Sequence, residues 1–293
     1  MKRYTYNHGL PFNKKLAENI DYEIKRVELK KASMIIVDGI VGEGKTTLAI
    51  HIADYINHKH GMKNVSLEKS NHPQLAMGGK EFQKNLRICY KEGFVVLIYD
   101  EAGDFNKRGS LTRFNEALNR TFETFRAFKV IIIMCLPSFE VLDNSLFDKG
   151  IPRLLLHCFD RNENYGNFAG YSLYLIFYLK KVMARETVKL MAYRKVYPNF
   201  YGQFLDIEPA RSKKLDILST TSKLEISKMA EIKMEGLLSY DDVSKKTLRS
   251  IIWVKKAVQN LKIKHSRIID RKKYFKSNVV DILLDYIDKK GVK

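Results

Sequence analysis

The chain has 293 residues, of which 45% are hydrophobic and 29% are charged. This balance is typical of a folded globular protein and excludes an intrinsically disordered chain, and the length suits one large domain with a smaller appendage. The formal net charge of +19 is unusual, and it would attract DNA, RNA or an anionic membrane surface. An A·T-rich genome that favours Lys codons would also produce a basic surface.

The cysteines and the apolar stretches bear on where the protein resides. Cys89, Cys135 and Cys158 are far apart, form no Cys-x-x-Cys pair and lie in apolar runs, so we predict buried thiols in a reducing compartment. The N-terminus continues into polar sequence instead of the apolar core of a signal peptide. The most apolar stretch, residues 171–179, is far shorter than the ~20 residues that cross a bilayer. We therefore expect a cytoplasmic protein without a stable membrane anchor.

The first hundred residues alternate between helical and strand-like patterns. After a lead-in segment (1–30), residues 33–38 form a continuous β-branched run that is typical of a strand buried on both faces. Gly93 is expected to end a helix, and the next apolar run leads directly to Asp100. The expected elements are a helix over 14–30, a strand over 33–38, a helix over 48–57, a weaker strand over 65–67, a helix over 80–92 and a strand over 94–99.

The alternation continues to about residue 180. The pattern predicts a helix over 111–128, strands over 129–135 and 153–159, and a strand over 171–178 that returns across a turn at 162–170. Strands that alternate with helices indicate an α/β fold with a doubly wound, mostly parallel sheet. We expect a main α/β domain over 31–180, a connector over 181–210 and a small, basic, all-helical domain over 211–293.

A glycine-rich motif follows the strand over 33–38. Gly39, Gly44, Lys45 and Thr46 match the Walker A pattern between an expected strand and an expected helix. In such a loop the backbone amides and the helix N-terminus face the phosphates of a nucleotide. The motif predicts that Lys45 is a catalytic residue that binds the β- and γ-phosphates and that Thr46 is a Mg²⁺ ligand. The expected nucleotide-binding residues are Gly39, Ile40, Val41, Gly42, Glu43, Gly44, Lys45, Thr46 and Thr47.

Two adjacent acids follow the apolar strand over 94–99. Asp100 is placed to hold the Mg²⁺ shell, and Glu101 to orient or deprotonate the attacking water, as in a Walker B motif. The solvated start of a loop would also place two acids here. Together, the two motifs predict a hydrolase that uses ATP and Mg²⁺. The sequence lacks the Asn-Lys-x-Asp motif that reads guanine.

A Glu beside the Walker B Asp, with an additional strand and helix between the two motifs, resembles the ASCE division of P-loop ATPases, which includes AAA+ and RecA-like proteins. Within that division, the strand end at Asp100, Glu101 and Ala102 and the run from Leu136 to Asp143 resemble the zonula occludens toxin (Zot) and FtsK/HerA group. The likeness covers residues 33–160. It implies a ring or another homo-oligomer that hydrolyses ATP and moves or packages DNA.

The resemblance also implies an arginine finger on the helix before the fourth strand. Arg126 is the first candidate for this catalytic role, before Arg120 and Arg113, because a guanidinium supplied to a neighbouring subunit would neutralise charge on the γ-phosphate. A surface Arg on an amphipathic helix is the alternative for each. The chain departs from the group after the sensor strand, where Cys135 or Ser138 stands in place of the usual Gln.

The basic charge is concentrated toward the C-terminus. Residues 211–293 contain 21 Lys and Arg and 10 Asp and Glu, so this segment carries +11 of the net +19. Ser239 and Asp242 are placed to cap a helix, and the apolar spacing predicts two short helices that meet near 247–250. This pattern looks like a helix-turn-helix with 253–261 as its second helix, although non-specific phosphate binding or a protein-interaction bundle would also fit. The candidate DNA-binding residues are Lys255, Lys256, Gln259, Asn260, Arg271, Lys272 and Lys273.

These features predict a Mg·ATP-dependent ATPase that handles DNA as an oligomer, in packaging or translocation for a virus or mobile element. One alternative is an AAA+-like helper of transposition, replication or partition, in which the bound nucleotide switches assembly on DNA. The other is a nucleotide kinase, which the adjacent acids and the basic tail disfavour.

Overall fold

The structure is a computed structural model of the chain, and it describes residues 3–5, 11–69, 71–100, 128–142, 144–162, 165–234, 237–269, 272–276 and 278–290. The chain divides into two compact units, Met1–Lys223 (unit 1) and Leu224–Lys293 (unit 2), and helix α8 (Pro209–Met234) crosses the boundary. This boundary lies beyond the 210/211 division that the composition suggests.

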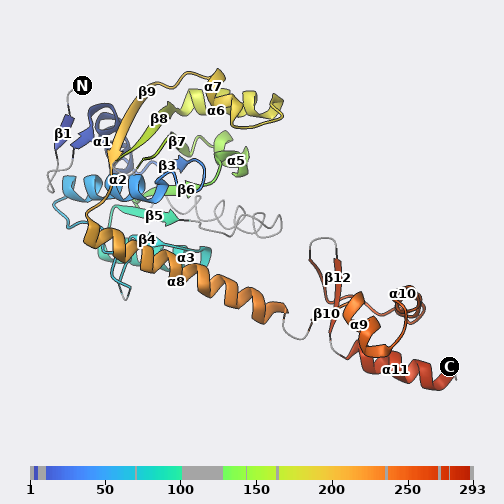
Figure 1. The fold of residues 1–293 in the computed structure, drawn as a ribbon. Helices are drawn as coiled ribbons and strands as arrows, with labels where there is room; N and C mark the ends of the chain where they lie inside the picture. The colour runs from blue at the N-terminus through green and yellow to red at the C-terminus, as the bar shows by residue number, and fades with distance from the viewer. Residues whose placement is uncertain are drawn as a thin grey trace. The chain divides into compact units, whose positions relative to one another are not determined.

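Unit 1 is built on a seven-stranded sheet (Figure 1). Five neighbouring strands are parallel, and the last two along the sheet are antiparallel to their neighbours. The expected α/β class with a mostly parallel sheet is therefore confirmed. In sheet order, the strands are β4 (Leu75–Ala76), β5 (Val96–Asp100), β6 (Ile131–Leu136), β3 (Ser33–Asp38), β7 (Pro152–Phe159), β8 (Tyr165–Ser172) and β9 (Phe200–Leu205).

Alternate strand residues fill two hydrophobic cores, one on each face of the sheet. On one face, Ile35 and Val37 of β3 join a core with α1 (Lys14–Glu28), α2 (Lys45–Lys59) and the start of α8. On the other face, Met34 and Ile36 join a core with the remaining helices of unit 1. Helices cover both faces, which is consistent with a doubly wound sheet. These remaining helices are α3 (Gly79–Glu92), η2 (Phe139–Val141), α5 (Asn144–Asp148), α6 (Leu173–Arg185) and α7 (Met191–Lys195).

The N-terminal segment belongs to unit 1. Strands β1 (Arg3–Thr5) and β2 (Pro11–Asn13) form a small antiparallel sheet, and α1 follows directly. Leu16, Ile20 and Ile24 of α1 are buried in the core, as their helical spacing predicts. The expected lead-in segment therefore supplies part of the core of unit 1.

Two strand predictions in unit 1 are wrong. Residues 173–178 belong to helix α6 rather than to a strand, because Ile176 and Leu179 are buried while Tyr174 and Tyr178 are exposed, which is helical spacing. The weaker strand over 65–67 is absent from the ladder, because the Val65 amide donates to a side chain, Asp54 Oδ1, at 2.8 Å. The other expected strands are confirmed as β3, β5, β6 and β7, and the expected helices before residue 93 are confirmed as α1, α2 and α3. The helix predicted over 111–128 lies almost entirely outside the described residues.

Unit 2 is a small α/β unit, so the expectation of an all-helical domain is wrong. Helices α9 (Tyr240–Thr247) and α10 (Ile251–Asn260) meet at the turn over 248–250, which confirms the two predicted helices. Three antiparallel strands accompany them in the sheet order β10 (Leu237–Ser239), β12 (Lys272–Lys276), β11 (Arg267–Ile269). Helix α11 (Val279–Lys290) completes the unit. Strands β10 and β11 have only three residues each and β12 is rich in Lys, so none shows a period-2 apolar pattern long enough to predict it.

Among the described residues, no helix combines the length and the apolar character that crossing a membrane requires. The three cysteines are free and buried, as predicted.

Candidate functional site

The loop over residues 39–44, here called the glycine loop, connects the end of β3 to the start of α2. Gly39 has φ of 143°, and a Cβ atom on it would lie 2.5 Å from the Cys158 carbonyl oxygen. Gly44 has φ of 78° and is the N-cap of α2. Both positions need glycine, Gly39 because β7 passes so closely and Gly44 because its backbone is left-handed. The loop therefore depends on the glycines that the motif specifies.

Lys45 is folded against the glycine loop. Its Nζ donates to the carbonyl oxygens of Gly39 and Ile40, each at 2.8 Å, so the loop wraps around the ammonium group. Helix α2 has no side-chain cap at its N-terminus. The first-turn amides and the ammonium group therefore concentrate positive charge at the base of this loop.

Thr46 and Asp100 are brought together across the sheet. Thr46, at the start of α2, donates its hydroxyl to Asp100 Oδ2 at 2.9 Å. Asp100 is the last residue of β5, and β6 lies between β5 and β3 in the sheet. Asp100 is only 9% exposed. The two predicted Mg²⁺ ligands are thus adjacent, although they are 54 positions apart in the sequence.

The oxygen donors at this position fit Mg²⁺. A hydroxyl and a carboxylate are hard ligands, and Mg²⁺ commonly takes one or two protein ligands and completes its octahedron with phosphate oxygens and water. In the part of the chain that the structure describes, no group of three or more His, Cys, Asp or Glu could hold a metal ion. A magnesium ion bound at Thr46 and Asp100 would complete its octahedron with phosphate oxygens and water.

The two candidates for a sensor residue have other roles. Cys135 is opposite Asp100 in the ladder and is fully buried, and burial with Asp100 nearby raises the pKa of its thiol well above the ordinary value. Ser138 caps η2, where its side chain accepts from the Glu140 amide. Glu101, Arg113, Arg120 and Arg126 lie outside the described residues.

A buried network lies directly before the glycine loop. Asp38, the last residue of β3, is 1% exposed and accepts from the Phe139 amide at 3.0 Å. Its carboxylate also contacts His157 Nδ1 at 2.9 Å and accepts from the Tyr193 hydroxyl. The His157 and Tyr193 rings are stacked with centroids 3.5 Å apart. Burial, and next the Asp38 charge, raises the pKa of Tyr193. The Asp38 carboxylate therefore links the end of β3 to three other segments, which are η2, strand β7 and helix α7. This network lies where the glycine loop begins.

A second group of residues, from near positions 160 and 205, contacts the glycine loop. The Arg161 amide donates to Glu43 Oε2 at 2.9 Å, and the Arg161 guanidinium pairs with Asp206. A Cβ atom on Gly44 would lie 2.9 Å from the Phe204 ring and 3.2 Å from Arg161 Cδ. The sequence analysis missed these contacts because they depend on the register of β7, β8 and β9. No local spacing relates residues near 160 and 205 to a loop near 40.

The predicted DNA-binding residues of α10 lie on one face. Lys255, Lys256, Gln259 and Asn260 are all exposed, while Val254, Ala257 and Val258 are buried against the core of unit 2. Lys273 is exposed on β12. Arg271 lies outside the described residues, and Lys272 is described by its backbone in β12 alone.

Comparison with known proteins adds no assignment. No protein-family model matches the chain, and no curated protein is significantly similar to it.

Proposed function

We propose that the protein is a P-loop ATPase of the ASCE type that hydrolyses Mg·ATP and handles DNA. The observation that carries the ATPase proposal is the 2.9 Å contact between Thr46 Oγ1 and Asp100 Oδ2, next to an ammonium group wrapped by the glycine loop. These side chains would hold a cation beside a loop that would bind phosphate, at the carboxyl edge of the parallel strands where α/β proteins bind ligands. The position of β6 between β3 and β5 supports the ASCE assignment.

Each side chain would have a distinct role. The Lys45 ammonium would exchange the Gly39 and Ile40 carbonyls for oxygens of the β- and γ-phosphates, and the first amides of α2 would donate to the same phosphates. Thr46 and Asp100 would hold Mg²⁺, which neutralises phosphate charge when it is bound. Asp38 would act as a positioning residue, because it fixes the strand end from which the glycine loop starts.

Hydrolysis needs a base and an attacking water. Glu101 follows Asp100 directly, and we assign it the role of base. The water oxygen would form a bond to the γ-phosphorus while the bond from that phosphorus to the β–γ bridging oxygen breaks. The products are ADP and inorganic phosphate, and Glu101 takes one proton from the water. Arg126 of a neighbouring subunit would stabilise the charge on the transferred group, which makes a homo-oligomer the proposed active form.

The DNA part of the proposal depends on unit 2. The segment from α10 through β12 is rich in Lys and Arg, and the two helices α9 and α10 joined by a short turn are compatible with a helix-turn-helix. ATP hydrolysis at unit 1 combined with DNA binding at unit 2 would make the protein a motor or loader acting on DNA.

The ATPase proposal is tested by measuring Mg·ATP binding and phosphate release, with and without DNA. We expect Lys45→Ala and Asp100→Asn each to reduce hydrolysis roughly a hundredfold or more, the size of effect seen when a preorganised transition-state contact is removed. Lys84→Ala is the matched control, because Lys84 is exposed on α3 and has no place in the proposed site. Full hydrolysis by Lys45→Ala at an unchanged oligomer mass would refute the proposal.

A further inference from the structure

The shape and the charge of unit 2 bear on which form of nucleic acid it binds. We infer that unit 2 binds double-stranded DNA, with α10 in the major groove and the hairpin β11–β12 against the neighbouring backbone. The inference rests on the proposed DNA-handling function and adds its substrate class. It is argued from unit 2 alone.

The turn before α10 is fixed by hydrogen bonds. The Arg249 amide donates to the Ser244 carbonyl at 3.1 Å, and the Ser244 hydroxyl donates to the Arg249 carbonyl. The side chain of Ser250, the N-cap of α10, accepts from the Trp253 amide at 3.3 Å. Beneath the turn, Val243 of α9 packs with Val254 and neighbouring residues of α10. A preordered turn presents α10 as a rigid element, which lowers the entropic cost of binding.

The outward face of α10 fits a groove lined by anions and base edges. Its exposed residues are two lysines, two amides and two isoleucines. An α-helix is about 10–12 Å across, and the major groove of B-DNA is about 12 Å wide. Lysines bind phosphates, Gln and Asn can pair with adenine, and aliphatic side chains contact the thymine methyl group. The six residues are Ile251, Ile252, Lys255, Lys256, Gln259 and Asn260.

Charge is segregated within unit 2. Between Asp242 and Asp270 the sequence contains eight Lys and Arg and no acid, and this stretch includes all of α10. The acids Asp281, Asp285 and Asp288 lie instead on α11. Lysines also lie on α9 and α11, but the stretch that includes α10 is the one without an acid. An uncompensated basic stretch beside a basic hairpin is the electrostatic footprint of a nucleic-acid site.

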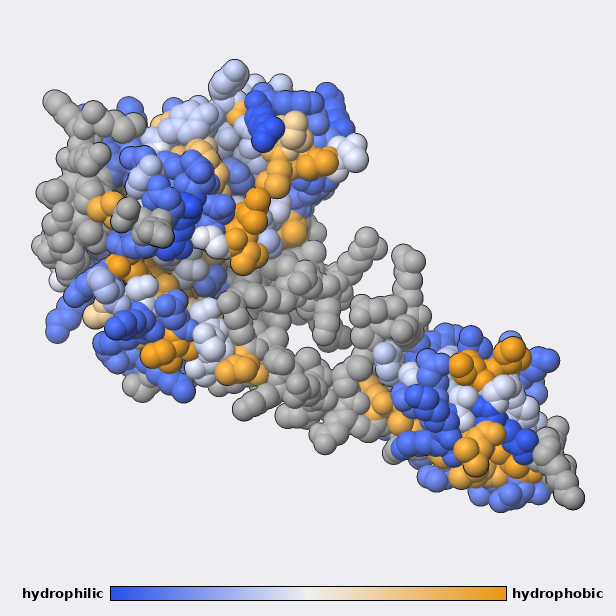
Figure 2. Space-filling view, viewed as in Figure 1, coloured by the Kyte–Doolittle hydropathy of each residue, from blue (hydrophilic) through white to orange (hydrophobic). Residues whose placement is uncertain are grey.

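The exposed side chains argue against a single-stranded substrate. Proteins that bind single strands stack the bases on exposed aromatic rings. Among the described residues of unit 2, every large hydrophobic side chain that is highly exposed is aliphatic, and Leu248 (89%) and Ile252 (71%) are the most exposed. Trp253 packs against Tyr286, and Tyr240 packs against Phe275, although these last two rings also line a hollow beside α10. The face viewed in Figure 2 is mostly hydrophilic over unit 2, with small apolar patches.

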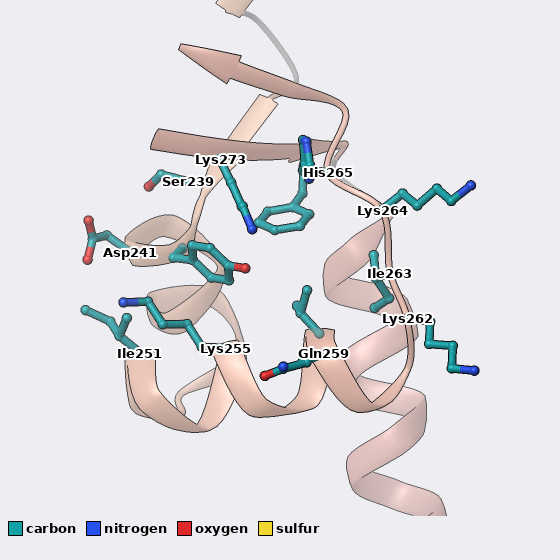
Figure 3. Close-up of a pocket in the computed structure, with 13 residues that line it drawn as sticks. Ser239, Asp241, Ile251, Lys255, Gln259, Lys262, Ile263, Lys264, His265 and Lys273 are labelled. Atoms are coloured by element: carbon teal, nitrogen blue, oxygen red, sulfur yellow. The ribbon is translucent and has the colours of Figure 1, made fainter. Parts of the chain in front are cut away.

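A hollow of about 870 Å³ separates α10 from the sheet. Figure 3 shows Lys273, from β12, on one side of the hollow and Lys255 and Gln259, from α10, on the other. Lys262 and Lys264 extend outward from the loop that joins α10 to β11. Asp241 is the acid on the lining and lies at the start of α9. When α10 lies in the major groove, the sugar–phosphate backbone beside that groove would pass between these lysines. A duplex has two backbones at a fixed spacing, so it would fit the outer face of α10 and the hollow at the same time.

The experiment compares the binding of the full chain to a duplex, to each of its single strands and to an RNA duplex of the same length, by fluorescence anisotropy without nucleotide. We expect the DNA duplex to bind roughly tenfold or more tightly than either alternative, because A-form RNA has a major groove that is too narrow for a helix. Equal or tighter binding of a single strand, or of duplex RNA, would overturn the inference.

A pair of charge reversals separates a local site from general attraction. Lys256→Glu changes the outward face of α10, and Lys289→Glu makes the same change in net charge on exposed α11. We expect Lys256→Glu to weaken duplex binding roughly tenfold and to lower the slope of log affinity against log salt by about 1, while Lys289→Glu has little effect. Equal losses in the two variants, or no loss in either, would overturn the inference in favour of non-specific attraction or a protein partner for α10.

The design also separates this inference from the proposed ATPase activity. Lys45→Ala should bind the duplex as the unmodified chain does. Duplex binding by a chain that never hydrolyses ATP would refute the proposed function and leave the inference standing. Hydrolysis by a chain that shows no duplex preference would do the reverse.

Discussion

The glycine loop of unit 1 is held by hydrogen bonds between specific atoms, whereas the outer face of α10 in unit 2 consists of exposed lysine, amide and isoleucine side chains. In unit 1, Lys45, Thr46 and Asp100 each have a defined partner within 3 Å. In unit 2, Lys255 and Lys256 are exposed. Their contribution to the binding of a polyanion would depend on their distance from other charges. The first kind of site responds to one substitution with a large loss, and the second responds gradually and according to salt concentration.

The two units can be observed separately, because Trp253 is the only tryptophan and lies in unit 2. Its fluorescence reports the unfolding of unit 2, while circular dichroism reports both units. The variants below use this separation.

The largest effect on stability is expected at Asp38. Asp38→Ala removes the acceptor of the Phe139 amide and the Tyr193 hydroxyl inside the core, so we expect unit 1 to lose about 3 kcal/mol of unfolding free energy. Urea unfolding followed by circular dichroism would measure this loss, with the Trp253 transition unchanged. Asp38→Asn keeps one oxygen acceptor and should lose less. Equal stability of Asp38→Ala and the unmodified chain would contradict the positioning role.

The next effect is a pH dependence in unit 1. Burial raises the pKa of the Cys89 thiol from 9.0 to about 12, so above pH 9 the unfolded chain is ionised at this residue while the folded chain is not. The stabilisation is complete below pH 9 and is lost as the pH rises, by about 1.4 kcal/mol per pH unit for one thiol. Cys89→Ala should make the decline between pH 9 and 11 shallower by that amount in urea titrations. An unchanged slope would show that the thiol titrates alike in both states.

The smallest effect is expected in the turn before α10. Leu248 is 89% exposed and has a left-handed backbone with φ of 54°, which is unfavourable for a side chain with a Cβ atom. Leu248→Gly should therefore raise the midpoint of the Trp253 transition. We expect the unfolding free energy of unit 2 to rise by about 0.5 kcal/mol, after subtracting the cost of glycine's greater flexibility in the unfolded chain. Leu248→Ala keeps the strain and should be neutral. A lower midpoint for the glycine variant would mean that Leu248 makes stabilising contacts.

The sequence analysis succeeded where structure is determined locally. Strand β3, the glycine loop and the start of α2 follow from one contiguous run of residues, and the capping pair Ser239 and Asp242 marks the start of α9. The proximity of Thr46 and Asp100 was predicted because the motif supplies it. Local patterns also failed in identifiable ways: the aromatic run over 171–178 contains both strand-favouring residues and helical spacing, and tertiary packing decides in favour of α6.

Contacts that depend on sheet register could not be predicted. His157 and Tyr193 meet Asp38 because β7 lies beside β3 and α7 covers the same face. Arg161 reaches Glu43 for a similar reason. Nothing in the spacing of these residues reveals such a pairing, because each partner comes from a different part of the chain. The same limit hid the strands of unit 2, of which two have only three residues and the third is rich in Lys.

The ring of Phe204 has a consequence for how the two activities could be coupled. It fills the space that side chains on Gly44 and Gly166 would need, and Phe204 is only five positions before Pro209, where α8 begins. Helix α8 in turn continues into unit 2. If nucleotide binding shifts the loop backbone, the loop would press on this ring, and the strand that carries the ring is joined by a short segment to the helix that leads into unit 2, for which we propose DNA binding. Phe204 would thus transmit movement of the glycine loop to α8. Phe204→Leu should therefore reduce the stimulation of ATP turnover by DNA and leave turnover without DNA unchanged.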